Sequence, residues 1–205
     1  MEKTNSINVK HVVIDPSAIG LFGLAMVTLV ASSQKLGITS GVSGIIPWAI
    51  FLGAIAQLVA AAYDAKHNNV FGATAFFGYG LFWLGIASTW MVQSGIFGAE
   101  FQSAFDPNEL GIAFIGYLIF TLIMTIGAIE TNKVLLIIFI LIDLLFIGLS
   151  LSTFGIAYHE THMLAGFAKL GIAIVSFYGV AANVLNQHFN RTFLPLGKPL
   201  GIFKK

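Results

Sequence analysis

The sequence predicts an all-α polytopic membrane protein with six transmembrane helices, and three observations support that fold class. Lys, Arg, Asp and Glu together make up only 9% of the 205 residues, whereas hydrophobic residues make up 57%. A soluble globular chain carries about 25% charged residues. The mean hydropathy is +0.89, and long stretches contain no charged side chain. The charged residues are too few to cover a water-exposed surface, so lipid is expected to surround much of the protein.

The positions of the charged residues define the six spans in order. Residues 16–34, 36–63, 67–99 and 110–129 contain no Lys, Arg, Asp or Glu, and a span needs about 20 apolar residues. A last apolar tract over 134–190 holds two spans, separated by a predicted loop at 159–162. The predicted helices cover residues 17–37, 45–63, 70–94, 109–129, 133–156 and 163–187. They form one domain over 1–205, with short tails at about 1–15 and 189–205.

Capping residues support the starts of the first, third and fifth spans. Asp, Asn and Thr side chains accept hydrogen bonds from free amides at helix N-termini, and Pro suits the first helical position. The sequence supplies Asp15 followed by Pro16, Asn68 or Asn69, and Thr131 or Asn132. These residues predict that the three helices begin near residues 16, 70 and 133.

The distribution of basic residues predicts the orientation in the cell membrane. An even number of spans puts both termini on one side. That side carries eight of the ten basic residues: Lys3, Lys10, Lys66, Lys133, Arg191, Lys198, Lys204 and Lys205. The opposite loops carry acidic residues: Glu100, Asp106, Glu109 and Glu160. Because basic residues are retained on the cytoplasmic side, both termini are predicted to be cytoplasmic.

Several functional classes are disfavoured. The chain has no Cys, which excludes disulfides, thiolate metal ligands and a Cys nucleophile. A net charge of +1 without a basic run argues against a nucleic-acid partner. His159 and His162 are three residues apart, whereas the His-Glu-x-x-His zinc motif spaces its histidines by four. No metal site, cofactor or enzyme activity is predicted.

Two charged residues fall inside the predicted spans. Asp143 lies about 15 Å along the fifth span, near the bilayer centre. Lys169 lies about 9 Å along the sixth span, from where its side chain can reach the interface. These depths disfavour a direct ion pair. Two roles for Asp143 remain open: a structural hydrogen bond to another helix, or proton-linked transport in which its protonated carboxyl group donates to a passing carboxylate.

Short strings of residues carry a family resemblance. The chain reads Asp-Pro-Ser-Ala-Ile-Gly-Leu at 15–21, Ala-Gln at 56–57, Asn-Val-Phe-Gly-Ala-Thr-Ala-Phe at 69–76, Tyr-Gly-Leu-Phe-Trp-Leu at 79–84, Val-Leu-Asn at 184–186 and Phe-Asn-Arg-Thr-Phe-Leu-Pro-Leu-Gly at 189–197. Together they resemble the acetate uptake transporter family, whose bacterial members include succinate–acetate permeases. The family motif Asn-Pro-Ala-Pro-Leu-Gly-Leu is retained at Pro16, Gly20 and Leu21, and Asp15 replaces its Asn.

The resemblance implies a hexamer of six-helix protomers, each with its own conduction path. Family members have a hydrophobic constriction of Phe, Tyr and Leu on the first, third and fifth spans. By position, these residues become Leu24, Tyr79 and Ile142, of which only the Tyr matches. Polar residues placed along the substrate path are Gln57, Thr74 and Asn69.

The predicted function is therefore a membrane transporter or channel for acetate and related small mono- and dicarboxylates. A hydrophobic neck disfavours bare charge, so transport is expected to be pH-dependent or linked to protons. The alternative is a channel for small neutral solutes such as urea or amides. Glycine and other small residues recur inside the spans and permit close packing of helices, which agrees with a homo-oligomer in the lipid bilayer.

Overall fold

The computed structural model describes residues 14–203, and all of the regular secondary structure in that range is helical. The helices are α1 (Ser17–Lys35), α2 (Ile46–Trp48), the π-helix η1 (Ala49–Ala56), α3 (Gln57–Lys66), α4 (Val70–Gln93), α5 (Ala99–Ala104), α6 (Pro107–Ala128), α7 (Lys133–Thr153) and α8 (Tyr158–His188). With α2, η1 and α3 joined end to end, the described residues contain six helices long and apolar enough to cross a membrane. The predicted fold class is confirmed.

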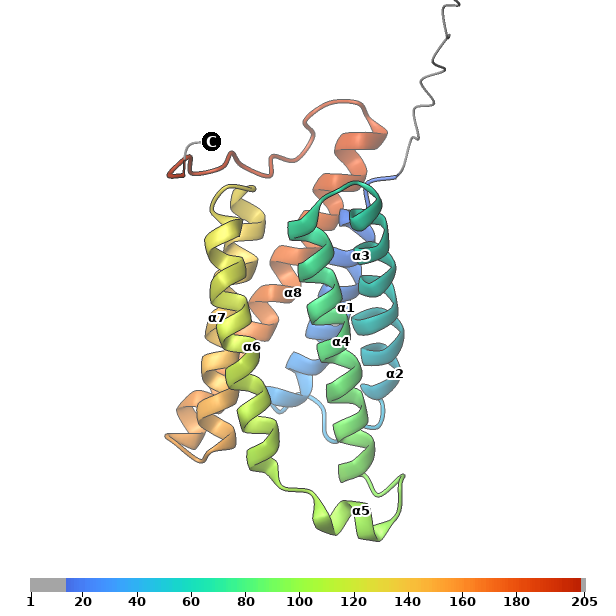
Figure 1. Cartoon of the computed structure of the whole chain (residues 1–205), viewed down its shortest axis with the longest axis vertical. Coiled ribbons are helices and arrows are strands. Elements are labelled where there is room, and N and C mark those ends of the chain that lie inside the picture. Colours follow the sequence, from blue (N-terminus) through green and yellow to red (C-terminus); the bar gives the residue numbers. More distant parts are fainter. Residues whose placement is uncertain (1–13, 204–205) are drawn as a thin grey trace, which may run out of the picture.

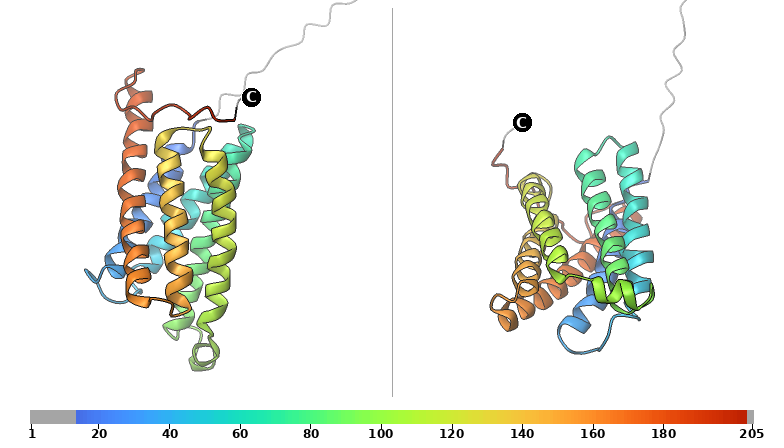
Figure 2. Two further views of the ribbon diagram at one scale, coloured as in Figure 1. Left: turned by 90° about the vertical axis from the view of Figure 1, so that its left-hand side faces the viewer. Right: turned by 60° about the horizontal axis from the view of Figure 1, so that its bottom comes forward.

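The six spans, seen from the side in Figure 1, contact one another in chain order, and the last span also contacts the first. Helix α8 packs against both α1 and α7, α7 packs against α6, and α4 packs against η1 and α3, which in turn contact α1. Figure 2 shows α6, α7 and α8 side by side along one face. Both ends of the described chain lie at the same end of the bundle (Figure 1), which we call the terminal end; the opposite end, near α5, is the distal end. The cytoplasmic orientation remains a prediction, and the basic residues at 3, 10, 204 and 205 lie outside the described residues.

Asn69 and Asn132 cap the third and fifth spans as predicted, whereas the first span begins one residue later than its capping residues predicted. Asp15 Oδ1 accepts a hydrogen bond from the Ser17 amide at 2.9 Å, but α1 begins at Ser17, so Pro16 occupies the N-cap position and not the first helical position. The Asn69 side chain accepts from the Gly72 amide at 3.1 Å. Asn132 Oδ1 accepts from the Leu135 amide at 3.0 Å. These bonds satisfy amides that have no partner within the helix.

The start of the last span was predicted wrongly. Helix α8 begins at Tyr158, not at 163, so the two histidines lie in its first turns rather than in a loop. The tight turn before it uses the positive φ angles of Gly155 (73°) and Ala157 (44°). The described residues contain no group of three His, Asp or Glu side chains that could hold a metal ion. The short helix α5 was also not predicted.

Close helix contacts fix how α1 and α4 pack around the second span. A Cβ on Gly23 would collide with the backbone carbonyl oxygen of Leu52. A Cβ on Gly53 would lie 2.8 Å from the Trp83 side chain and 3.0 Å from that of Val27. Small residues thus allow α1 and α4 to approach η1 closely, as expected where van der Waals packing holds membrane helices together.

Candidate functional site

A cavity of about 260 Å³ opens among the spans at the terminal end; we call it the terminal cavity. Its walls come from α1, α3, α4, α7 and α8, with Leu196 from the C-terminal segment. Most of its lining is apolar. The polar side chains in the lining are Ser17, Gln57, Asp64, Asn69, Tyr79, Thr131, Asn132 and Asn183.

The three predicted constriction residues meet at this cavity. Leu24, Tyr79 and Ile142 all line it, and their exposed fractions are 6%, 5% and 3%. They come from α1, α4 and α7, and each lies seven to nine residues after the start of its helix. That separation corresponds to a depth of about 10–14 Å. The structure therefore places all three near the inner end of the cavity.

A second cavity of about 250 Å³, the distal cavity, lies at the other end of the same bundle. It is bordered by the ends of α1, α4 and α7 together with α6 and the first half of α8. Its lining residues are Gln34, Lys35, Val42, Phe82, Trp83, Ile86, Thr89, Trp90, Gln93, Leu110, Phe114, Leu149, Thr153, His162 and Lys169. The bundle thus has one cavity at each end.

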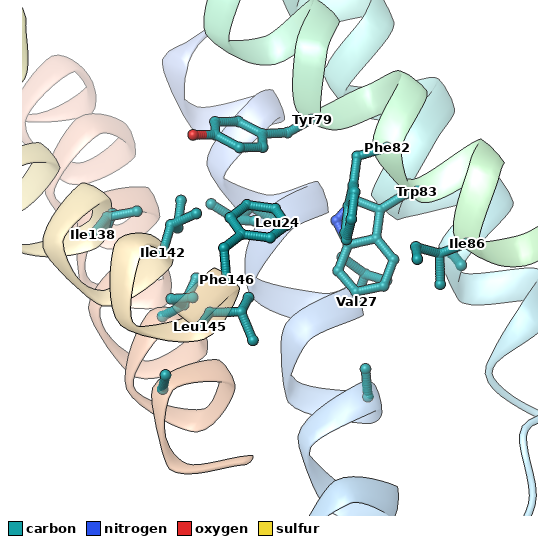
Figure 3. Close-up of a cluster of buried hydrophobic side chains, with 14 of the residues drawn as sticks. Leu24, Val27, Tyr79, Phe82, Trp83, Ile86, Ile138, Ile142, Leu145 and Phe146 are labelled. Atoms are coloured by element: carbon teal, nitrogen blue, oxygen red, sulfur yellow. The ribbon is translucent and has the colours of Figure 1, made fainter. Parts of the chain in front are cut away.

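An apolar layer separates the two cavities. Val27, Leu145 and Phe146 line neither cavity and are at most 4% exposed. Figure 3 shows Phe146 of α7 between Tyr79 and Trp83 of α4, with Leu145 beside Phe146 and Val27 of α1 close to Trp83. The Phe146 ring stacks on Tyr117 at 5.6 Å between centroids. We call Val27, Leu145 and Phe146 the seal; on α7, Ile142 of the terminal cavity and Leu149 of the distal cavity are seven residues apart, about 10 Å along the helix.

The seal residues were missed in the sequence, although a spacing rule identifies them. Each follows a predicted constriction residue on the same helix by three or four positions: Val27 follows Leu24, and Leu145 and Phe146 follow Ile142. Residues three or four apart share one face of a helix. The face that lines the terminal cavity therefore continues inward as the seal.

Gln57 is a buried polar group on the wall of the terminal cavity. It is 0% exposed and stands at the junction of η1 and α3. Its Nε2 donates to the Gly53 carbonyl oxygen at 2.7 Å, whereas its Oε1 has no partner among residues 14–203. A buried oxygen without a partner is costly, so a ligand with a hydrogen-bond donor would be stabilised beside it.

The Tyr79 hydroxyl group donates its hydrogen bond to another side chain of the protein. Its Oη lies 2.9 Å from Thr121 Oγ1, and Thr121 Oγ1 donates its only proton to the Tyr117 carbonyl oxygen at 2.8 Å. Tyr79 must therefore donate to Thr121. The bond ties α4 to α6 and holds the ring across the cavity, leaving only acceptor capacity on the Tyr79 oxygen for a solute.

The two other predicted path residues differ in position. Asn69 lines the terminal cavity, but its amide groups bond to Asp64 Oδ1 (2.8 Å) and the Gly72 amide. Thr74 is exposed and lines neither cavity. It precedes Tyr79 by five residues, a rotation of about 140° around the helix. The structure thus does not place Thr74 on the path.

The two charged residues inside the spans have different surroundings, and that of Asp143 agrees with the structural hydrogen bond to another helix that the sequence left open. Asp143 lines neither cavity, and its Oδ2 accepts a hydrogen bond from Thr125 on α6 at 2.7 Å. The expectation that Lys169 reaches the interface was wrong. Because α8 begins at Tyr158, Lys169 lies about 16 Å along it, and it is only 7% exposed.

The motif at the start of α1 supports the wall of the terminal cavity. Pro16 is buried, and Leu21 lines the cavity. A Cβ on Gly20 would collide with the ring of Phe76 on α4, so only glycine allows this approach. Asp15 joins α1 to the end of α8 through its Oδ2, which accepts from Gln187 Nε2 at 3.4 Å.

A comparison with known protein families identifies the family to which this six-helix bundle belongs. The model of the GPR1/FUN34/yaaH family matches residues 2–198. The chain belongs to the GPR1/FUN34/yaaH family. Within it, the chain is 32% identical over 185 residues to the succinate-acetate/proton symporter SatP of Escherichia coli strain K12, covering 90% of this chain and 95% of that protein.

Two further relatives show the breadth of the GPR1/FUN34/yaaH family. Ammonia transport outward protein 2 of Saccharomyces cerevisiae is 27% identical over 181 residues, which cover 86% of this chain and 64% of that protein. Among solved structures, that of the bacterial acetate channel SatP superimposes with a TM-score of 0.83 at 29% identity. The match covers 91% of this chain and all of that one.

Proposed function

We propose that this protein conducts acetate and related small mono- and dicarboxylates across the cell membrane through the interior of its helix bundle. The observation that carries the proposal is a pair of cavities at opposite ends of one bundle, with the buried apolar residues of the seal between them. The relatives named for succinate–acetate symport and for an acetate channel supply the substrate class. No enzymatic step is required.

The composition of the seal favours movement of charge-neutral species. Val27, Leu145 and Phe146 offer no hydrogen bond to replace the water around a carboxylate, and a narrow apolar neck excludes bare ions by dewetting. A carboxylic acid, or a carboxylate moving together with a proton, crosses such a neck more readily. Gln57 Oε1, on the wall of the terminal cavity, would accept a hydrogen bond from the hydroxyl group of the neutral acid.

The test is flux in reconstituted vesicles. Uptake of labelled acetate and of labelled urea would be measured at a series of external pH values, with protein-free vesicles as the control for passive diffusion. Protein-dependent acetate uptake that rises as the pH falls supports the proposal. Protein-dependent urea uptake without acetate uptake would favour the neutral-solute alternative.

We further propose that six protomers assemble. A groove lined by Gly78, Ala113, Gly116, Tyr117 and Phe120 lies between α4 and α6, and Gly116 has open space beyond its backbone. Small residues at a membrane-facing surface let another helix approach closely. Native mass spectrometry should find a species six times the 22.0 kDa protomer mass; a protomer alone in mild detergent contradicts the proposal.

For orientation, we propose cytoplasmic termini. Lys66 ends α3, and Lys133 begins α7, both at the terminal end, as the positive-inside rule requires. A C-terminal epitope should then be inaccessible to antibody in intact cells and accessible after permeabilisation.

A further inference from the structure

Lys169 is a buried cation without a counter-charge. Its side chain lines the distal cavity and is 7% exposed. Among residues 14–203, no hydrogen bond or ion pair to its ammonium group is found. Charged residues inside a membrane span are costly and normally face a partner or a water-filled cavity that serves a function. Here the cavity is present and the partner is missing.

A second cation lies in the same cavity. Lys35, the last residue of α1, lines it with Lys169. Gly166, one turn before Lys169 on α8, packs against the side chains of Leu36 and Lys35. The two lysines therefore enter the cavity about one turn apart.

The distal cavity contains no compensating acid. None of its lining residues is Asp or Glu. The acidic residues of the distal loops, Glu100, Asp106, Glu109 and Glu160, are exposed and lie outside the lining. His162 adds a third titratable group: one ring nitrogen lies 3.1 Å from the Lys35 carbonyl oxygen, and Nδ1 is buried without a partner among residues 14–203.

We propose that the distal cavity is a binding site for a small carboxylate anion, with Lys169 as its principal ligand and Lys35 as the second cation. Two ammonium groups without acids attract an anion, and charge-assisted hydrogen bonds to carboxylates are among the stronger ones. The indole rings of Trp83 and Trp90 form part of the same wall. They offer an apolar surface to an alkyl group, which favours an organic acid over an inorganic anion.

The site lies directly before the seal. Phe82 and Trp83 line the distal cavity, and the Phe82 ring contacts Phe146 of the seal at 5.2 Å between centroids. An anion held by Lys169 would thus wait at the point where it must lose its charge or gain a proton to proceed. The choice of a carboxylate rests on the proposed function; the prediction that an anion binds rests on the lysines and the cavity.

A structural role for the lysines is the competing explanation. Helices α1, α4 and α7 all end near this cavity, and the partial negative charge of helix C-termini attracts cations. In that case Lys169 would stabilise helix ends and bind no solute. Binding measurements separate the two roles because only an anion site responds to added carboxylate.

The test uses the fluorescence of Trp83 and Trp90 in the purified full-length protein. The third tryptophan, Trp48, lies outside the cavity and is removed by Trp48→Phe in all samples. Sodium acetate is titrated at constant ionic strength, with acetamide as a neutral ligand of similar shape. The variants are Lys169→Met, which keeps a long apolar chain without the charge, and the control Lys66→Met, an exposed lysine at the terminal end.

The proposal predicts saturable binding of acetate and weaker binding of acetamide. It also predicts that the affinity for acetate falls by about tenfold or more in Lys169→Met but not in Lys66→Met. Equal affinity in the parent and a folded Lys169→Met protein overturns it, as does the absence of a saturable acetate response. If Lys169→Met does not fold, Lys35→Met decides by the same criterion. Acetate flux, measured on the same preparation, tests the proposed function separately, because binding without flux and flux without binding are distinct outcomes.

Discussion

Replacing Tyr79 with alanine is expected to widen the path and relax its selection by size. The Tyr79 ring, 5% exposed, packs against Phe120 and Phe139 with centroids 5.5 and 6.1 Å away. Each aromatic pair contributes about 0.5–1.5 kcal/mol, and the hydroxyl bond to Thr121 adds about 0.5–1.5 kcal/mol. Large-to-alanine changes at buried aromatic sites cost about 3–5 kcal/mol in all, so the folded fraction must be checked first.

The size of the effect on selectivity follows from the apolar lining. One extra methylene changes discrimination in a hydrophobic pocket by about 1–3 kcal/mol, or 10–200-fold. Butyrate has two more methylenes than acetate, so the butyrate-to-acetate uptake ratio should rise by at least about tenfold in Tyr79→Ala. The assay is uptake of both labelled acids into vesicles at equal protein density.

Two variants isolate the cause. Tyr79→Phe removes only the hydroxyl group and should keep the parental uptake ratio, because the ring still crosses the cavity. Phe77→Ala removes a ring that is 55% exposed on the same helix and should also leave the ratio unchanged. An unchanged ratio in a folded Tyr79→Ala protein would refute the assignment of this ring to the path.

Three further predictions concern the supporting structure. Asp143→Asn should retain the parental pH profile of acetate uptake, because the side chain still accepts from Thr125 and lies outside both cavities; a flattened profile would instead assign Asp143 to proton-linked transport. Gly23→Ala should lower thermal stability, because its Cβ meets a backbone oxygen, whereas the control Gly85→Ala has open space; equal melting temperatures contradict this packing. Asn186→Ala should expose residues 189–203 to protease, because its side chain makes three hydrogen bonds to residues 193 and 194; an unchanged digestion rate argues against that anchor.

The spans were predictable because charged side chains are costly in the bilayer core. Long stretches of sequence without charged residues therefore mark the transmembrane helices. Asn69 and Asn132 predicted two helix starts correctly, because a polar side chain at the N-cap accepts a hydrogen bond from a free amide in the first turn. The start of α8 was missed because Glu160 and its polar neighbours read as a loop, although an acidic residue in a first turn is favourable to a helix. That single error of five residues also misplaced Lys169, which moved from the interface into the distal cavity.

The candidate site was predictable where one helix face carries it. The positions of Leu24, Tyr79 and Ile142 came from the family resemblance, and the seal follows from them by helical periodicity. Thr74 lies about 140° around α4 from Tyr79, so it does not share the helix face that lines the cavity. The sequence alone could not place Gln57 at the end of a π-helix, because no residue pattern distinguishes η1 from an α-helix. Nor could it show that the Tyr79 hydroxyl bonds to Thr121, 42 residues away.

Blocking the path inside the bundle tests the central claim most directly. The natural chain has no Cys, so Ala75→Cys would place a single thiol in the lining of the terminal cavity. Ala62→Cys, exposed on α3 and outside both cavities, is the matched control. Acetate uptake into vesicles is measured before and after treatment with a bulky thiol reagent, with the extent of labelling checked by mass. We predict that labelling abolishes uptake by Ala75→Cys and leaves Ala62→Cys unchanged; full acetate uptake by completely labelled Ala75→Cys would contradict conduction through this bundle.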